Sequence, residues 1–543
     1  MSEVTGAIRP VEQFADRLLD ALSDRERSER TVALILLAYV ALWTIYGVIA
    51  KGGQDIHFDM SEQFTLAREL ALGYYNHPPL NMLIVRLWFA VFPAADWAYY
   101  LLAGTNAAIA LWIAWRLFAR FLDDHKRVLG LALLTLVPFF NFHALKFNRN
   151  TVLMPLWAAT TLFFLRSLET RRLHDAALAG FFAAVAVYGK YWSAVLLLGL
   201  AVAAVTDPRR AEYFRSPAPW ITVLVGGLVI APHLVWLVDN DFAPFSYAFY
   251  VHGGASLTSS FVGVMRYLAG SIAYVLVPIL IVFLCARPSR EALSDMLWPR
   301  DHHRRLAATA FWAALLMPVL VAPAIGVRLT SVWSMSAWTL LPVMLLSSPL
   351  VAIGRKDASR IVMVAAVFPL LVLAAAPAIG FAVHRGGPAA NGHSSLLAEP
   401  LDQFWREVTN APLKVFGSTD AFTYGVPFYL REHPVAVHVL ERGATPAEEA
   451  LIANNGAAFA CPITSIFCVN EANRRAGATV GAKRKEIEVR RSYLGNEGSS
   501  QRYLLVAISP SGAASISHGR NCFVLMLWRG ADFVPRASFY PRD

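Results

Sequence analysis

Two acidic side chains just after the first apolar segment are the first candidates for chemistry. Asp59 and Glu62 are three residues apart, so on a helix both face the same way. Acidic residues this close to an apolar segment require a reason. As an N-cap, Asp59 would form a capping box with Glu62 at the third helical position, and a capping carboxylate that faces a cavity can still accept a proton. The sequence leaves a structural role and a role as general base open.

The chain turns sharply after this acidic pair. His77, Pro78 and Pro79 follow one another, and proline lacks the backbone N–H of a helix and restricts its predecessor to extended conformations. Beyond the turn, apolar residues recur at helical spacing on one face, with Arg86 off it: Leu80, Leu83, Ile84, Leu87, Trp88 and Val91. This pattern is typical of a helix in a membrane interface. We therefore expect a reentrant surface of two interfacial helices that carries Asp59.

The chain that must position these residues is unusually apolar. Of its 543 residues, 56% are hydrophobic and 16% are charged, against about 45–50% and about 25% in soluble domains. Uncharged runs of about 18 residues or more, the length that crosses a bilayer, recur through most of the chain. The sequence predicts a polytopic α-helical membrane protein and disfavours a water-soluble multidomain enzyme. The net charge of +10 fits Lys and Arg in cytoplasmic loops, so no nucleic-acid partner is expected.

We predict eleven spans, with the N-terminus in the cytoplasm. They lie at residues 31–50, 97–118, 128–147, 152–168, 176–190, 192–206, 219–238, 267–286, 307–325, 335–353 and 361–383. This arrangement places the Arg-rich loops inside, as the positive-inside rule requires. Residues 176–206 could also form one long helix. We favour two short helices broken around residues 188–191, because a single helix would place every later arginine cluster outside.

Three regions follow from these spans. Residues 1–30 form a cytoplasmic arm, either an amphipathic helix on the membrane or a solubilising cap; residues 31–383 form the transmembrane domain; residues 384–543 form a small α/β domain. The odd span count puts this last domain outside, in the periplasm of a bacterial cell. Its predicted strands are residues 413–417, 457–461, 487–493, 503–508 and 523–528. A disulfide between Cys461 and Cys468 and two buried thiols are equally compatible with the sequence.

Several motifs resemble a known family. Asp59 and Glu62, followed by Gly73-Tyr74 and His77-Pro78-Pro79, are similar to the first external loop of bacterial glycosyltransferases of family 39. This family includes protein O-mannosyltransferases, aminoarabinose transferases and rhizobial lipid A galacturonosyltransferases. The stretches KFNRNT at residues 146–151 and APHLVW at residues 231–236 also resemble it. This chain departs from the family in two ways: many relatives have adjacent Asp-Glu at the first position, and several carry a second acidic residue near residues 146–151.

The resemblance implies a GT-C membrane fold and the inverting transfer of a sugar from a polyprenyl phosphate to a lipid A-like glycolipid or glycan of the envelope. This reaction needs a base for the acceptor and cations for the phosphate. The expected catalytic residues are Asp59, as the base, and Glu62. The candidates for binding the donor phosphate are His77, Lys146, Arg149, Lys190 and Arg328. Lys190 is equally compatible with snorkelling, and Arg328 is better explained as a juxtamembrane arginine. No metal and no cofactor are expected.

Two other classes of protein compete with this interpretation. A transporter or flippase of lipid-linked substrates would also have many spans and a broken helix, but such proteins usually show internal repeats and charges at the bilayer midplane. The sequence shows no repeat, and the candidate charges gather at one face. A receptor or scaffold that binds envelope components through the C-terminal region would not need Asp59 at all. The glycosyltransferase is the interpretation we favour.

Overall fold

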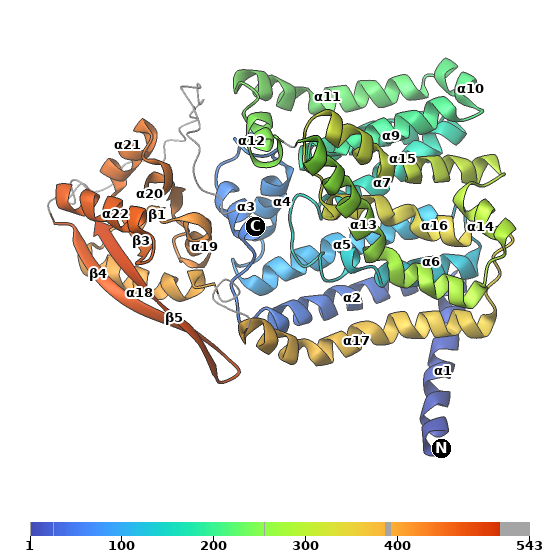
Figure 1. Cartoon of the computed structure of the whole chain (residues 1–543), viewed down its shortest axis with the longest axis horizontal. Helices are drawn as coiled ribbons and strands as arrows, with labels where there is room; N and C mark the ends of the chain where they lie inside the picture. Colours follow the sequence, from blue (N-terminus) through green and yellow to red (C-terminus); the bar gives the residue numbers. More distant parts are fainter. Residues whose placement is uncertain (1, 25, 255, 386–391, 480, 511–543) are drawn as a thin grey trace.

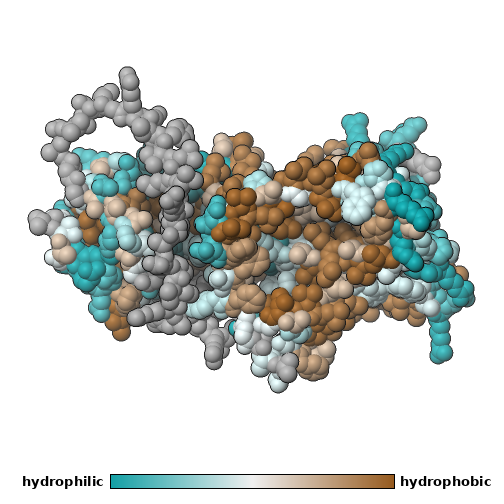
Figure 2. Space-filling model, turned by 90° about the horizontal axis from the view of Figure 1, so that it is seen from above, coloured by the Kyte–Doolittle hydropathy of each residue, from teal (hydrophilic) through white to brown (hydrophobic). Residues whose placement is uncertain are grey.

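The structure is a computed structural model that describes residues 2–24, 26–254, 256–385, 392–479 and 481–510. A bundle of helices extends to Arg385, and a smaller unit with a sheet lies at one end of this bundle (Figure 1). Hydrophobic residues cover the flank of the bundle, and hydrophilic residues gather at its far end and on the sheet unit (Figure 2). Such an apolar flank between polar ends is expected where helices face lipid.

Six helices among the described residues are long and apolar enough to cross a membrane. They are α2 (Ser28–Ala50), α5 (Asp96–Phe118), α11 (Ala218–Asp239), α13 (Leu257–Ala286), α15 (His302–Ala324) and α17 (Arg355–Arg385). The other helices around them are α6 (Asp124–Thr135), α7 (Leu153–Thr170), α8 (Leu173–Gly189), α9 (Ser193–Thr206), α10 (Arg210–Arg215), α12 (Ala243–His252) and α14 (Arg290–Leu297). The structure confirms the prediction of many apolar helices, but it does not confirm the predicted count of eleven spans.

Two of the predicted spans are not continuous helices. In place of 128–147, helix α6 ends at Thr135 and a short 3-10 helix, η1 (Pro138–Phe140), follows. In place of 335–353, a 3-10 helix, η2 (Ser331–Leu340), leads into α16 (Leu341–Leu346). Prolines explain both endings: Pro138 cannot donate the N–H that would continue α6, and Pro349 keeps its predecessor out of helical conformation.

The predicted break in residues 176–206 is confirmed. Helix α8 ends at Gly189 and α9 begins at Ser193, and between them Lys190 has an extended backbone with φ −165° and ψ 133°. Gly189 packs closely against α7, because a Cβ at this position would lie 3.0 Å from the Leu153 side chain. The break thus holds Lys190 next to the start of α7.

The N-terminal arm forms helix α1 (Ser2–Ser23), which runs crosswise to α2 and α17 at the end of the bundle remote from the sheet unit (Figure 1). Leu19 and Leu22 are buried against the bundle, and Asp20 forms an ion pair with Arg355 at 2.7 Å. The helix is therefore docked on the bundle, and its position on a cytoplasmic membrane surface stays a prediction.

The loop after α2 contains the two expected short helices, α3 (Phe58–Leu66) and α4 (Leu80–Phe89). Met82 and Val85 of α4 face the core, whereas Leu87 and Val91 are largely exposed. Arg86 donates hydrogen bonds to the carbonyls of Ala67 and Arg68 at 3.1 and 2.7 Å, which ties α4 to the end of α3. An exposed apolar stripe on a short helix fits the predicted interfacial position.

The C-terminal unit is built on a five-stranded sheet with the order β2-β1-β3-β5-β4. Its strands are β1 (Val415–Gly417), β2 (Val435–Val437), β3 (Ala457–Pro462), β4 (Lys483–Tyr493) and β5 (Asn496–Ile508), and its helices are α18 (Ser394–Val408), α19 (Asp420–Tyr429), α20 (Val439–Arg442), α21 (Pro446–Asn455) and α22 (Ile466–Ala478). β1 is parallel to β2 and β3, and β5 is antiparallel to β3 and β4.

Most of the predicted strands of this unit are present. The sequence missed β2, whose three residues are too short for a clear pattern, and the predicted strand at 523–528 lies outside the described residues. Cys461 and Cys468 form a disulfide between the end of β3 and α22, with their Cα atoms 5.6 Å apart. Of the two alternatives that the sequence left open, the structure thus has the disulfide.

Candidate active site

Helix α3 presents Asp59 in its first turn. The N-cap is His57, whose extended backbone (φ −62°, ψ 144°) precedes the helix and whose Nδ1 accepts a hydrogen bond from the backbone N–H of Asp59 at 3.1 Å. Of the roles that the sequence left open for Asp59, the structure thus excludes that of N-cap in a capping box with Glu62, because His57 takes the extended conformation that the cap position requires. Asp59 is left free for other contacts.

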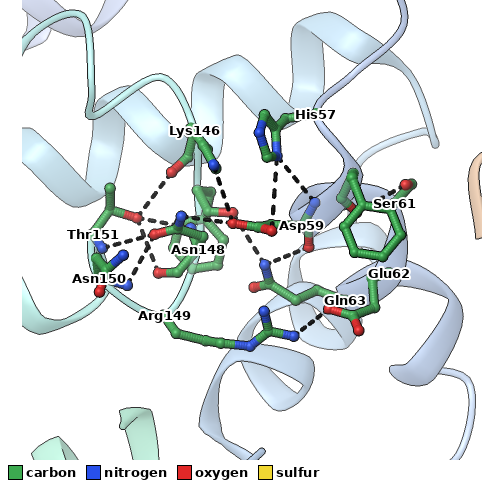
Figure 3. Close-up of polar contacts among 12 residues, drawn as sticks. His57, Asp59, Ser61, Glu62, Gln63, Lys146, Asn148, Arg149, Asn150 and Thr151 are labelled. Carbon is green, nitrogen blue, oxygen red and sulfur yellow. Dashed lines mark hydrogen bonds and ion pairs between the residues drawn. The ribbon is translucent and has the colours of Figure 1, made fainter. Parts of the chain in front are cut away.

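The two oxygens of the Asp59 carboxylate have different surroundings. Oδ2 accepts a hydrogen bond from Asn148 Nδ2 at 2.8 Å and lies 3.4 Å from Lys146 Nζ (Figure 3). Oδ1 lies 3.9 Å from His57 Nδ1, and no described residue donates a hydrogen bond to it. The side chain is 22% exposed. Oδ1 is thus the oxygen that can receive a proton from an incoming group.

Charged neighbours keep this carboxylate ionised. Burial alone would raise the pKa of Asp59, but the charges of Lys146 and Arg149, with the hydrogen bond from Asn148, outweigh burial and lower the pKa below its ordinary value. For His57 itself, burial is the largest influence and lowers the pKa to about 4. At neutral pH the site therefore combines a neutral imidazole with an anionic Asp59.

Glu62 has a closed environment. It is 4% exposed, its Oε2 forms an ion pair with Arg149 (Figure 3), and its Oε1 accepts a hydrogen bond from Asn76 Nδ2 at 2.9 Å. Burial disfavours the charge of Arg149, but the carboxylates of Glu62 and Asp59 raise its pKa. Because both oxygens of Glu62 are engaged, the geometry favours a role in holding Arg149 over direct proton transfer.

The polar loop before α7 carries the partners of both acidic residues. Within it, Asn148 Oδ1 accepts the backbone N–H groups of Asn150 and Thr151 at 2.9 and 3.2 Å, and Thr151 Oγ1 accepts the N–H of Asn148 at 2.8 Å (Figure 3). Such local bonds from Asn and Thr are typical of the start of a helix. They fix the Asn148 side chain with its amide directed at Asp59.

Lys190 joins the same loop from the break between α8 and α9. Its Nζ donates a hydrogen bond to Asn150 Oδ1 at 2.7 Å and lies 4.5 Å from the centre of the Trp333 ring. Asn150 is in turn bonded through its N–H to Asn148, which contacts Asp59. The structure thus connects Lys190 with the Asp59 site through two asparagines.

The last two predicted residues lie further out. His77 is held by backbone bonds to Tyr74 and stacks edge-on against Tyr247, with ring centres 5.7 Å apart. Burial, followed by the charges of Arg149 and Lys190, lowers the pKa of His77 well below its ordinary range. Arg328 is exposed, and the structure records a bond from its backbone N–H to the carbonyl of His252. His77 borders the cluster, whereas Arg328 is not brought to it.

Residues 231–236 contact the turn between α3 and α4. His233 Nδ1 lies 2.6 Å from the Leu72 carbonyl, and its Nε2 lies 2.9 Å from the Tyr191 hydroxyl. The Trp236 ring covers Gly73 so closely that a Cβ there would approach it to 2.3 Å. This contact explains why glycine occupies position 73.

Sequence reasoning missed several residues of this site. Asn148 and Asn150 lie within the KFNRNT stretch but were not singled out, because a neutral amide gives no charge signal. Trp333 and Tyr424 carry no motif, since segments far apart in the chain bring them to the site. Among the described residues, no three His, Cys, Asp or Glu side chains are grouped so as to hold a metal ion.

The chain is similar to several known glycosyltransferases. A family model described as dolichyl-phosphate-mannose-protein mannosyltransferase matches residues 76–236, which include the loop at 146–151 and Lys190 but begin after Asp59. The lipopolysaccharide core galacturonosyltransferase RgtB of Rhizobium johnstonii is 27% identical over 227 residues, 40% of this chain and 45% of that relative. The chain thus matches less than half the length of RgtB. RgtA of the same organism, also a lipopolysaccharide core galacturonosyltransferase, is 23% identical over 418 residues, 70% of this chain and 77% of RgtA.

The fold is that of a solved membrane enzyme. ArnT from Cupriavidus metallidurans, bound to undecaprenyl phosphate, superposes with a TM-score of 0.59 and 13% identity, over 88% of this chain and 99% of the ArnT chain. Its apo state gives a TM-score of 0.57. The chain therefore has the GT-C membrane fold, and the relatives that it matches are named glycosyltransferases. The resemblance to family 39 that the motifs predicted is confirmed, and the comparisons do not support a transporter or a receptor without enzymatic activity.

Proposed function

We propose that this glycosyltransferase moves a sugar from a polyprenyl phosphate to a hydroxyl of an envelope glycolipid or glycan, with inversion at the anomeric carbon. The proposal rests chiefly on one observation: the partly exposed carboxylate of Asp59 lies in one cluster with cations that are suited to a phosphate. Lys146 lies 3.4 Å from it, and the Asn148–Asn150 loop connects it to Lys190. A base and several cations at one place match what sugar transfer from a phosphate requires.

In this reaction, Asp59 and the two lysines each act at a different step. The acceptor oxygen attacks the anomeric carbon, and Oδ1 of Asp59 takes the hydroxyl proton. The bond between the anomeric carbon and the phosphate oxygen breaks, and its electron pair leaves with the polyprenyl phosphate. Lys146 and Lys190 hold the charge that develops on this phosphate, which is the main electrostatic contribution expected.

In this proposal the other three predicted phosphate ligands, Arg149, His77 and Arg328, contribute less than the two lysines. Arg149 already neutralises Glu62, and its buried Nε finds no hydrogen-bond partner among the described residues. That N–H is therefore the donor it offers to the ligand. His77 is a neutral neighbour at physiological pH, and Arg328 acts at most at the rim.

The acceptor is proposed from the relatives. RgtA and RgtB are named for the lipopolysaccharide core and for galacturonic acid. Both names support a lipopolysaccharide or lipid A acceptor and a uronic acid donor for this chain. We place the reaction on the periplasmic face of a bacterial inner membrane, with the N-terminus in the cytoplasm and the C-terminal unit in the periplasm.

The function is tested with purified enzyme in detergent or liposomes. Polyprenyl phosphate sugars are incubated with extracted lipopolysaccharide, and free polyprenyl phosphate is measured together with the modified acceptor. A transferase gives both products in equal amounts. Movement of the lipid-linked sugar across liposomes without release of polyprenyl phosphate would instead indicate a flippase.

The topology is tested with reporters. A reporter after Val383 should be active in the periplasm, and one in the loop between Arg287 and Arg305 should be active in the cytoplasm. Both reporters on one side of the membrane would contradict the proposed orientation.

A further inference from the structure

The loop that carries Asp59 is bound to the C-terminal unit as well as to the bundle. Asp55, four residues before Asp59, is 11% exposed in its side chain and contacts the start of α18 and Arg491 of β4. These contacts join segments that are more than 330 residues apart in the chain. They give the C-terminal unit a direct mechanical connection to the proposed base.

The carboxylate of Asp55 is fully engaged by the start of α18. Its Oδ2 accepts the backbone N–H of Ser394 at 2.6 Å, and its Oδ1 accepts the N–H and the hydroxyl of Ser395 at 3.2 and 2.7 Å. A carboxylate at a helix N-terminus is stabilised by the free N–H groups and by the helix dipole. Asp55 therefore acts as an external cap of α18.

Arg491 completes this contact. It forms an ion pair with Asp55, its Nε donates to the Gly392 carbonyl at 2.8 Å, and its Nη2 donates to Ser395 Oγ at 2.7 Å. Its side chain is 9% exposed. A Cβ at Gly392 would lie 2.5 Å from Asp55 Oδ2, so the close approach depends on glycine. Asp55, Ser395 and Arg491 each bond to both of the others, so the three side chains hold one another in place.

The segment between Asp55 and the end of α3 is held by α19. The backbone N–H of Ile56 donates to the Tyr429 hydroxyl at 2.9 Å, the Phe58 ring packs on Tyr424 with centres 5.6 Å apart, and the hydroxyl of Thr65 donates to the Tyr424 carbonyl at 3.2 Å. Figure 1 shows α19 next to α3 at the junction of the two parts. The backbone on both sides of Asp59 is thus fixed by the C-terminal unit.

We infer that Arg491 is a positioning residue for sugar transfer: through Asp55 it sets the place of the Asp59 loop, so that the C-terminal unit is part of the catalytic machinery. This inference rests on the proposed role of Asp59 as base. A displacement of about 1 Å from a remote change can lower a rate about 100-fold. Loss of the Arg491 contact should therefore act on turnover, with the donor cations left in place.

The test compares Arg491→Met with a matched control, Arg475→Met. Arg475 of α22 is 8% exposed and forms ion pairs with Glu449 and Glu471 at 2.8 and 2.9 Å. It lies in the same unit but does not contact the Asp59 loop. Arg491→Met should lower kcat about 10–100-fold with the donor KM within about twofold, and Arg491→Lys should recover part of kcat. Arg475→Met should leave kcat within about twofold at a similar loss of thermal stability.

A second measurement does not depend on turnover. Hydrogen exchange of peptides covering residues 55–66 should accelerate in full-length Arg491→Met and not in Arg475→Met, because only the first change releases the loop. Equal kcat in Arg491→Met and the parent, or equal losses in both variants, would overturn the inference. Asp59→Asn is measured in parallel: if it stays active, the proposed base fails, whereas an inactive Asp59→Asn with a fully active Arg491→Met rejects the positioning role alone.

Discussion

The replacement Asp59→Asn separates catalysis from stability most sharply. The amide keeps the size of the carboxylate and can still present an oxygen to Asn148 Nδ2, which now donates at 2.8 Å. It cannot accept a proton at the position of Oδ1. A positioned general base contributes about 10²–10⁴-fold to the rate, so kcat should fall by this factor. This loss corresponds to an activation barrier that is about 2.7–5.5 kcal/mol higher.

The stability change should be small in comparison. The interaction lost is the ion pair with Lys146 at 3.4 Å, whose side chain is 38% exposed. Pairs open to solvent contribute about 0.2–1 kcal/mol. The thermal midpoint in detergent should therefore stay close to that of the parent, while transfer is nearly abolished.

The assay measures free polyprenyl phosphate under single-turnover conditions, with Glu69→Gln as the matched control. Glu69 is exposed, and its carboxylate undergoes the same chemical change ten residues from Asp59. This control should keep parental kcat. Retention of more than about a tenth of kcat in Asp59→Asn would refute the assignment of the base, since a base contributes at least about 100-fold. A large loss of folded protein with normal specific activity would reduce Asp59 to a structural role.

Three further results are expected. Glu62→Gln should destabilise the protein by about 3–5 kcal/mol, because it removes the ion pair of the largely enclosed Arg149 charge. The double variant with Arg149→Met should regain stability in thermal unfolding but not activity, and normal stability of the single variant would contradict the importance of this pair. The folded pKa of Asp59 lies below its unfolded value, so ionisation of this group stabilises the fold above about pH 3.9, and this contribution is lost as pH falls through the folded pKa. The pH profile of kcat/KM should accordingly show no acidic limb from Asp59 between about pH 5 and 8. An acidic limb near pH 6 that disappears in Asp59→Asn would argue against the lowered pKa. Lys190→Ala should raise the donor KM about 10–100-fold, by the loss of a charge-assisted contact of about 1.5–3 kcal/mol, and Lys190→Arg should restore part of it; unchanged donor kinetics in Lys190→Ala would remove this residue from the phosphate site.

The local sequence determined the elements around the site. Proline marks where a helix must end, so the turn at His77 could be predicted from residue types alone. The break before Lys190 was predicted from the arginine clusters of the later loops, which two short helices keep inside. Apolar periodicity likewise indicated α4, and the disulfide between Cys461 and Cys468 was compatible with their spacing. Asp59, Lys146 and Lys190 were found because charged residues next to apolar segments are conspicuous.

The span count could not be read in the same way. Hydropathy detects an apolar run but not whether the run forms one continuous helix. The runs at 128–147 and 335–353 are interrupted by proline and by 3-10 turns. Packing inside the bundle satisfies the backbone groups that such interruptions free. A window average therefore counts these segments as spans although their helices are short.

Only the tertiary structure gives the surroundings of the two acidic residues. The sequence does not show that Glu62 is closed by Arg149 and Asn76, whereas one oxygen of Asp59 stays open. The contact between Asp55 and Arg491 spans 436 positions. No local pattern encodes such a pair, because periodicity and spacing describe neighbours along the chain, and burial of a charge is decided by whatever distant segment folds against it.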